Sequence, residues 1–318
     1  MITGFDPVPR RVAVVGAINM DITGTPDSAM IDGDSNPGVI TLSPGGVGRN
    51  LAENLILLGN RVSLVSALGE DFYANILEEH CRDLGLDLSM SFTVPGGRTS
   101  SYLCLNGTDG NVIGAVSDMA IVDQITPERL LPCLPRLNEF DLVVMDANLP
   151  AKTLSFLARE IRVPLMADPV SVKKAPRLKE ALSGLLAIKP NVPEAEVLSG
   201  ITIRDDRDLA KAAEVLFDAG VRNVFISLGA RGVHVYDGTD HETVPCIPGP
   251  VVNTTGCGDA FISATGYALL CGMNARKAAR FGLAASALCA GTPLAVDPAM
   301  TPERILAILK NNPSEIQT

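Results

Sequence analysis

The sequence contains no tryptophan, only 4% aromatic residues and only three histidines. Its seven cysteines are scattered, odd in number and free of any Cys-x-x-Cys pair, which argues against a disulfide framework or a structural zinc site. No stretch reaches the ~18–20 continuous apolar residues of a membrane span. Residues 1–11 also lack the apolar core of a signal peptide. The sequence therefore predicts a soluble cytoplasmic protein.

Basic residues are also scarce. The 26 Lys and Arg residues are outnumbered by 36 Asp and Glu residues, so the net charge is −10. This balance disfavours broad electrostatic binding to nucleic acid. It does not exclude a phosphorylated small molecule, because backbone N–H groups can bind phosphate. At roughly 150 residues per domain, the 318 residues allow one large domain or two ordinary ones.

Short apolar runs alternate with helical patterns along most of the chain. The expected strands are Arg11–Val15, Val62–Ala67, Leu142–Met145, Val163–Ala167, Leu185–Ile188, Val224–Ser227 and Val233–Tyr236. The expected helices include Phe72–Leu84, Asp206–Ala219, Cys257–Cys271, Ala275–Ala290 and Pro302–Lys310. Strand–helix alternation with short connections predicts right-handed βαβ units and a mostly parallel sheet in an α/β fold.

Two segments, about 17–43 and 90–122, lack helical patterns. In the second, Ser101–Leu105 and Asn111–Val116 flank the turn-rich stretch 106–110, which is typical of a β-hairpin. The two segments together predict a small β lid. We therefore expect residues 1–318 to form a single α/β domain with this lid inserted near its start.

The strongest local motif is 253–260, an extended segment followed by glycines and an apolar helical run. Gly256 and Gly258 permit a concave nest of N–H groups at a helix N-terminus, which can stabilise a phosphoryl group in transfer. Asp259, in the first turn, can accept a proton from a hydroxyl nucleophile. Taken alone, the motif is equally compatible with a Gly-rich turn and an ordinary acidic helix start.

Two further motifs lie at loop-to-helix junctions. Gly45, Gly46 and Asn50 belong to a Gly-rich segment that would admit a small polar ligand, or would form a tight turn with a capping Asn. Asn191 and Glu194, which follow Lys189 at the end of an apolar strand, can face one site and suit a hydrated Mg²⁺. The alternative for this pair is a helix-capping arrangement.

Two strand ends complete the set. Ser227–Gly232 is a Gly-spaced turn that fits either a nucleotide-contacting edge or any β-turn. Asp21 lies just beyond the first strand, where open α/β sheets bind ligands. Its carboxylate could accept hydrogen bonds from vicinal sugar hydroxyls, although a solvated loop Asp is the alternative.

Taken in this order, the motifs resemble those of the ribokinase-like carbohydrate kinases, the PfkB family. The resemblance extends from Val12 to about Leu309, and the two family signatures correspond to Gly45–Ala52 and Asn253–Ala264. It implies a three-layer α/β/α sandwich and an ATP-dependent kinase. Segments 34–38, 44–50, 99–103, 117–119 and 168–171 are similar to members that phosphorylate pseudouridine. Another nucleoside, a sugar such as ribose, or a non-catalytic binding role are the alternatives.

The resemblance also implies roles for individual residues. Asp259 would be the general base, and the N–H groups of Gly256, Cys257 and Gly258 would form the anion hole. The substrate would contact Asn19, Asp21, Asn36, Gly45, Gly46, Asn50, Ser100, Ser101, Asp118, Asn148 and Asp168. ATP would lie along Lys189, Asn191, Glu194, Ser227, Gly229 and Gly232, with Mg²⁺ held by Asn191 and Glu194 largely through water.

Two departures from the family pattern are evident. Asn253 stands where the family usually has an Asp that helps to fix a monovalent cation, which leaves a K⁺ requirement open. Cys257 stands where Ala is common, and its thiol is either oxidation-sensitive or simply a small buried side chain. The resemblance finally implies a homodimer formed through the lid, which would cover exposed strand edges.

Overall fold

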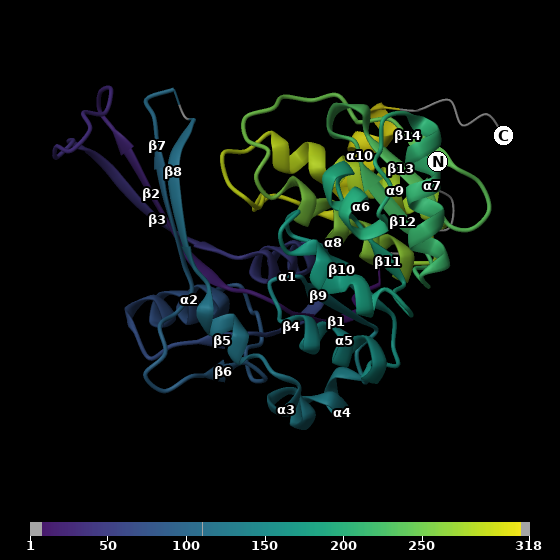
Figure 1. Cartoon of the computed structure of the whole chain (residues 1–318), viewed down its shortest axis with the longest axis horizontal. Helices are drawn as coiled ribbons and strands as arrows, with labels where there is room; N and C mark the ends of the chain where they lie inside the picture. The colour runs from purple at the N-terminus through teal and green to yellow at the C-terminus, as the bar shows by residue number, and fades with distance from the viewer. Residues whose placement is uncertain (1–7, 110, 313–318) are drawn as a thin grey trace.

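The structure is a computed structural model that describes residues 8–109 and 111–312 (Figure 1). Most of segment 1–11, for which we expected no signal peptide, lies outside the described residues. Gly110 of the expected hairpin turn also lies outside them. No helix in the described ranges is long and apolar enough to cross a bilayer.

The main body is built on an eight-stranded sheet in the order β14-β13-β12-β11-β10-β9-β1-β4. Neighbours from β4 to β12 are parallel, whereas β13 pairs antiparallel with both β12 and β14. The strands are β1 (Arg11–Val15), β4 (Arg61–Val65), β9 (Leu142–Asp146), β10 (Leu165–Asp168), β11 (Ala187–Ile188), β12 (Val224–Ser227), β13 (Val233–Tyr236) and β14 (Glu242–Val244).

Side chains alternate between the two faces of this sheet, so two cores form. Val12 and Val14 pack on one side, whereas Ala13 and Val15 pack on the other. The first core is covered by α1 (Val47–Leu57), α2 (Phe72–Asp83), α8 (Cys257–Leu270), α9 (Ala275–Ala290) and α10 (Pro302–Asn311). The second is covered by α3 (Pro127–Leu130), α5 (Ala151–Glu160), α6 (Val192–Ser199) and α7 (Asp206–Asp218). The predicted α/β/α fold class is thus confirmed.

A four-stranded small sheet in the order β3-β2-β7-β8 projects from this body (Figure 1). Its strands are β2 (Asn19–Pro26), β3 (Gly38–Gly45), β7 (Ser101–Asn106) and β8 (Val112–Asp118). Partners in register share a face, so Ile22, Leu42, Leu103 and Val116 lie on one side. Asp21 lies on the opposite side, so the small sheet has an apolar face and a polar face.

Only part of the segment 90–122 joins the small sheet. Phe92–Thr93 forms β6 and pairs with β5 (Ala67–Leu68) in a separate two-stranded sheet. Ile121 and Val122 lie in the buried core of the body, within the short 3-10 helix η1 (Ala120–Gln124). The remaining short elements are η2 (Leu131–Cys133), α4 (Leu134–Leu137), η3 (Ala175–Ala181) and η4 (Gly229–Arg231).

Two central strands are shorter than the apolar runs predict. The run Val163–Ala167 contains Pro164, which has no N–H for a ladder hydrogen bond, and regular pairing begins at Leu165. The run Leu185–Ile188 lies beside β10, since Leu186 N–H donates to Leu165 O at 2.7 Å. Only Ala187 and Ile188 pair regularly there.

Candidate active site

Polar side chains gather where the central parallel strands end. Asp146 and Asp168 are the last residues of β9 and β10, and Lys189 follows β11 directly. Because parallel strands end at the same edge of a sheet, their side chains converge there. The start of α8 brings Asp259 to the same edge, which places a cluster of buried charges at one end of the sheet.

Asp259 has the environment of a general base. Its Oδ2 accepts a hydrogen bond of 2.8 Å from Asn50 Nδ2, across 209 positions of sequence. Burial and the neighbouring Asp168 carboxylate raise the pKa of Asp259 to about 7, although Asn50 and Lys189 oppose the shift. A carboxylate with a pKa near neutral is matched to proton abstraction from an alcohol.

The start of α8 forms a backbone anion site. Gly256 caps the helix with φ +81°, and a Cβ there would lie 1.8 Å from Ala295 O, so only glycine fits. Cys257 N–H donates to Thr254 O at 3.3 Å, so this expected anion donor already has a partner. Among the described residues, Gly258 and Asp259 have no such carbonyl partner for their N–H groups.

Lys189 supplies a positive charge beside these N–H groups. Its Nζ lies 3.5 Å from Asp168 Oδ2, and a Cβ on Gly258 would lie 2.6 Å from the same Nζ. Burial acts to lower the pKa of Lys189, but the carboxylates of Asp168, Asp259 and Glu194 outweigh burial and raise it. The ammonium group is therefore charged and lies against the start of α8.

A cavity of about 670 Å³ opens from this point along β12 and β13. Six of the predicted residues line it: Lys189, Ser227, Gly229, Gly232, Cys257 and Gly258. Its other walls include Phe261, within the second signature, and apolar residues that the sequence motifs did not indicate, among them Val251, Leu283 and Ala287. These residues come from separate segments without a shared pattern, so no sequence signal could have found them.

Asn191 and Glu194 form a reciprocal capping box at the start of α6. Glu194 N–H donates to Asn191 Oδ1, and Asn191 N–H donates to Glu194 Oε2, each at 2.9 Å. The capping alternative is therefore realised, and neither residue lines the cavity described above. No group of three or more His, Cys, Asp or Glu side chains in the described ranges is arranged to hold a metal ion. The capping box engages Asn191 Oδ1 and one of the two Glu194 carboxylate oxygens, Oε2.

The predicted sugar-binding residues lie at the base of the small sheet. Asn19 Nδ2 donates to Asp21 Oδ1 at 2.6 Å. A Cβ on Gly45 would lie 2.1 Å from Asp21 Oδ2, so glycine makes room for this carboxylate. A Cβ on Gly46 would lie 2.5 Å from Ala17 O, so glycine at this position allows the two backbone segments to lie close together. Asn50 does not cap α1, because its amide contacts Asp259.

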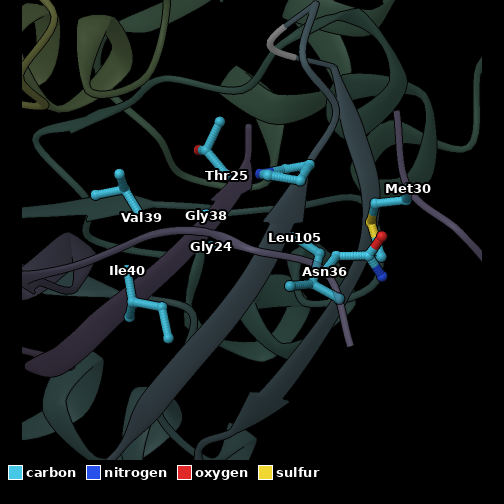
Figure 2. A pocket seen from close by; sticks show the side chains of 9 residues that line it. Gly24, Thr25, Met30, Asn36, Gly38, Val39, Ile40 and Leu105 are labelled. Atoms are coloured by element: carbon cyan, nitrogen blue, oxygen red, sulfur yellow. The ribbon is translucent and has the colours of Figure 1, made fainter. Parts of the chain in front are cut away.

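Several predicted residues lie apart from this cluster. Asn36 is in the β2–β3 loop, where its side chain bonds to Ile31 and Asp34, and it lines a shallow pocket beside Met30 and Leu105 (Figure 2). Asp118 forms an exposed ion pair with Arg98 at 2.9 Å.

The other predicted residues are closer to the body. Ser100 is fully buried, and its Oγ has no hydrogen-bond partner among the described residues. Ser101, at the start of β7, pairs in register with Asp118 and Met20. Asn148 is also buried, and its Oδ1 accepts from Lys174 Nζ.

Two charged residues of the site were not predicted. Asp146 is fully buried, and its carboxylate accepts from Ala17 N–H and Asn148 N–H, both at 2.8 Å. Its position directly after an apolar strand was a usable signal. Arg49, within the Gly-rich motif, is 4% exposed and contacts Asn50. Its role depends on tertiary contacts that the motif alone does not indicate.

Asn253 holds the loop before α8. Its Nδ2 donates to Pro293 O at 3.1 Å, and its Oδ1 accepts from Thr255 N–H at 3.0 Å. Cys257 lies next to Cys289, whose thiol hydrogen bond lowers the pKa of Cys257. All seven cysteines are free thiols.

A mostly parallel α/β sheet with a buried carboxylate, a helix-terminal anion site and a lysine at one edge suits transfer of a phosphoryl group to an alcohol. Comparison with known proteins identifies the family: the model described as pfkB family carbohydrate kinase matches residues 9–302. The chain belongs to this family, so the predicted family and reaction class are confirmed.

Individual relatives are similar over nearly the whole chain. It is 34% identical over 303 residues to the pseudouridine kinase of Escherichia coli (strain K12), covering 94% of this chain and 96% of that protein. It is also 34% identical over 300 residues to the uncharacterized sugar kinase YeiI of the same organism, covering 93% and 82%. Among solved structures, a carbohydrate kinase from Agrobacterium tumefaciens has a TM-score of 0.84 and 31% identity, covering 95% and 97%. The protein is therefore a sugar or nucleoside kinase.

Proposed function

We propose that the protein transfers the γ-phosphoryl group of ATP to the 5′-hydroxyl of pseudouridine, forming pseudouridine 5′-phosphate and ADP. The observation that carries the reaction is the buried Asp259 carboxylate beside the open N–H groups at the start of α8. The choice of pseudouridine is supported by the 34% identity to a pseudouridine kinase over 94% of the chain.

In the proposed reaction, Asp259 accepts the proton of the 5′-hydroxyl as its oxygen attacks the γ-phosphorus. The bond from phosphorus to the bridging oxygen of ADP then breaks, and ADP leaves with the electron pair. The N–H groups of Gly258 and Asp259 and the Lys189 ammonium stabilise the charge on the transferred phosphoryl oxygens. Bound Mg²⁺, approached through water by Asn191 and Glu194, would neutralise further phosphate charge.

Substrate and nucleotide would occupy opposite sides of Asp259. ATP would fill the cavity of about 670 Å³, whose apolar walls suit a base and whose end at Gly258 suits the phosphates. The ribose would lie at the base of the small sheet, where Asp21 offers carboxylate oxygens to vicinal hydroxyls. In this proposed arrangement the acceptor hydroxyl would lie near Asp259 rather than near the far end of the cavity.

A substrate panel tests the choice of acceptor. The rate of ADP release is measured with pseudouridine, uridine, adenosine, ribose and fructose at fixed ATP and Mg²⁺. We expect the highest kcat/KM with pseudouridine. A higher value with ribose would overturn the assignment and favour the second candidate, a ribose kinase, which the 28% identity to a Bacillus subtilis ribokinase supports. Omitting Mg²⁺ should abolish turnover.

We further propose that two copies associate through the apolar face of the small sheet. Leu42, Leu103 and Val116 are 49%, 41% and 66% exposed on this face, and such surfaces are normally covered. The Leu103→Glu variant should convert a dimer, of twice 33.4 kDa, to a monomer in light scattering. Thr41→Glu is the matched control, since Thr41 lies on the opposite face. A monomeric wild-type protein at micromolar concentration would overturn this arrangement.

The free cysteines support the cytoplasm as the compartment of this activity, since thiols remain reduced there.

A further inference from the structure

We propose that Arg49 is a positioning residue that holds the Asn50 amide with its nitrogen toward Asp259 and so keeps the base correctly hydrogen-bonded. This inference rests on the proposed role of Asp259 as general base. Arg49 itself would touch neither the acceptor nor ATP, and would act only through Asn50.

A continuous chain of contacts runs from His80 on α2 through Arg49 and Asn50 on α1 to Asp259 on α8. Arg49 Nη2 donates to Asn50 Oδ1, and Asn50 Nδ2 donates to Asp259 Oδ2 at 2.8 Å. Arg49 Nη1 donates to Glu53 Oε2, one turn further along α1, and lies 3.4 Å from His80 Nε2 on α2. Arg49, Asn50 and Glu53 are all buried, so solvent does not compete strongly for these groups.

The chemistry of the guanidinium group determines the direction of the amide. An Asn side chain has similar shape in its two flipped orientations, so packing alone distinguishes them poorly. Arginine, however, carries only donors and can pair only with the amide oxygen. Because Oδ1 is bound by Arg49, Nδ2 is the atom left for the Asp259 carboxylate.

The amide direction matters because Asp259 is crowded by charge. The ionisable groups of the described residues that interact with it are Asp146 at the end of β9, Asp168 at the end of β10, Lys189 after β11, Cys257 on α8 and Cys289 on α9. The hydrogen bond from Asn50 favours the ionised carboxylate and lowers the pKa of Asp259 against the effect of burial. A flipped amide would instead place Oδ1 against the carboxylate oxygen and disfavour ionisation.

Arg49 is itself anchored from three sides. Its backbone N–H donates to Ala17 O at 3.1 Å, which ties the first turn of α1 to the loop after β1. Glu53 holds the guanidinium as an ion pair four residues along the helix. His80 closes the other side and is partly exposed, with 31% of its side chain accessible. Burial raises the pKa of the nearby Asp21 carboxyl, and the positive charge of Arg49 opposes that shift.

The test compares Arg49→Met, Arg49→Lys and Asn50→Ala with the wild type. Because Arg49→Met leaves Glu53 buried without its partner, the double variant Arg49→Met/Glu53→Gln removes that charge as well. Arg136→Met is the control, because it breaks an arginine–carboxylate ion pair away from the site, between Arg136 and Asp87, whose atoms lie 2.6 Å apart in the parent protein. Each variant is assayed with the best acceptor of the substrate panel.

Arg49→Met and the double variant should lower kcat about tenfold near pH 6.5 and move the acid limb of the kcat profile up by about one pH unit. The KM for ATP should stay unchanged. The Arg49→Lys variant still donates to Asn50 Oδ1, so the acid limb of its kcat profile should lie close to that of the wild type. In the Asn50→Ala background, adding Arg49→Met should lower kcat by less than about a further twofold, because Arg49 acts only through Asn50.

Direct titration separates this inference from the proposed substrate. The Asp259 carboxyl carbon is followed by ¹³C NMR in the free enzyme and assigned with Asp259→Asn. A higher apparent pKa in the Arg49→Met/Glu53→Gln variant supports the positioning role even if pseudouridine is not the acceptor. An unchanged titration curve and acid limb, with only a lower melting temperature, would overturn it and leave Arg49 a purely structural role.

Discussion

The charged edge of the main sheet and the small sheet differ in how far their side chains are buried within one chain. At the edge of the main sheet, Asp168 and Asp259 are 4% and 9% exposed. Val170 N–H donates to Asp168 Oδ1, and Asn50 Nδ2 donates to Asp259 Oδ2. On the small sheet, Ile40 and Val116 are 74% and 66% exposed. The difference indicates that the charged groups are packed in place within the body, whereas the apolar face of the small sheet is left exposed in a single chain.

Burial explains why the chemistry lies in the body. A carboxylate on the exposed small sheet would keep an ordinary pKa, because water solvates its charge. At the ends of β9, β10 and β11 the carboxylates are desolvated and close together, so the pKa of Asp259 rises toward neutrality. Glycines make this crowding sterically feasible, since a Cβ on Gly16 would lie 2.2 Å from Asp146 Oδ2 and a Cβ on Gly258 would lie 2.6 Å from Lys189 Nζ.

The largest expected effect comes from removing the base. Asp259→Asn should lower kcat by roughly 10²–10⁴, the usual contribution of a positioned base. Asn50 can still pair with the new amide oxygen, so the fold should be retained. Steady-state kinetics measure the loss, and acceptor binding measured by calorimetry should persist. Turnover equal to that of the wild type would show that the body does not contain the proposed base.

A glycine pair tests whether the anion site is preorganised. Gly256→Ala places a Cβ 1.8 Å from Ala295 O, so the start of α8 must shift. Misplaced N–H donors should lower kcat about 10²–10³-fold. The control is Gly272→Ala, which has a similar φ of +82° but no atom within 4 Å of the added Cβ. It shares the backbone strain, so equal losses of kcat in the two variants would contradict the proposed role of the Gly256 clash.

Much of the fold followed from local patterns. The helix α7 spans Asp206–Asp218, as its apolar spacing predicts, because Asp205 caps its start and Gly220 follows its end. The strands β1 and β12 also match their apolar runs. Strand ends were less well predicted where pairing decides them, as at Pro164, since the neighbouring strand is not visible in the local pattern.

Residues of the candidate site could be predicted only where they belong to a sequence motif. Asp259, Gly256 and Lys189 were indicated by their places at loop-to-helix or strand-to-loop junctions. The contact between Asn50 and Asp259 spans 209 positions, so neither motif alone implies it. Asn191 and Glu194 were correctly placed in one turn, yet the sequence could not distinguish capping from a ligand site because both use the same residues.

The pH dependence of the reaction sharpens the contrast between buried and exposed groups. Because the pKa of Asp259 is raised to about 7, the base is progressively protonated as pH falls below that value. The value of kcat/KM should then fall about tenfold per pH unit below pH 6. Stability should change in the opposite sense. The native state holds this proton up to a higher pH than the unfolded chain, so the group's contribution to stability decreases between pH 4 and 7.

The smallest effect is expected at Cys257. The proposed phosphate site uses backbone N–H groups, so Cys257→Ala should keep kcat within about threefold of the wild type while leaving the helix start intact. The same variant should abolish any inactivation by a thiol-alkylating reagent, because Cys257 lines the cavity and its pKa is lowered by Cys289. ATP should slow alkylation of the wild type. The control is Cys246→Ala, an exposed cysteine at the mouth of the same cavity. If Cys257→Ala removed activity, the side chain itself would be part of the site, and the preorganised body would depend on more than backbone geometry.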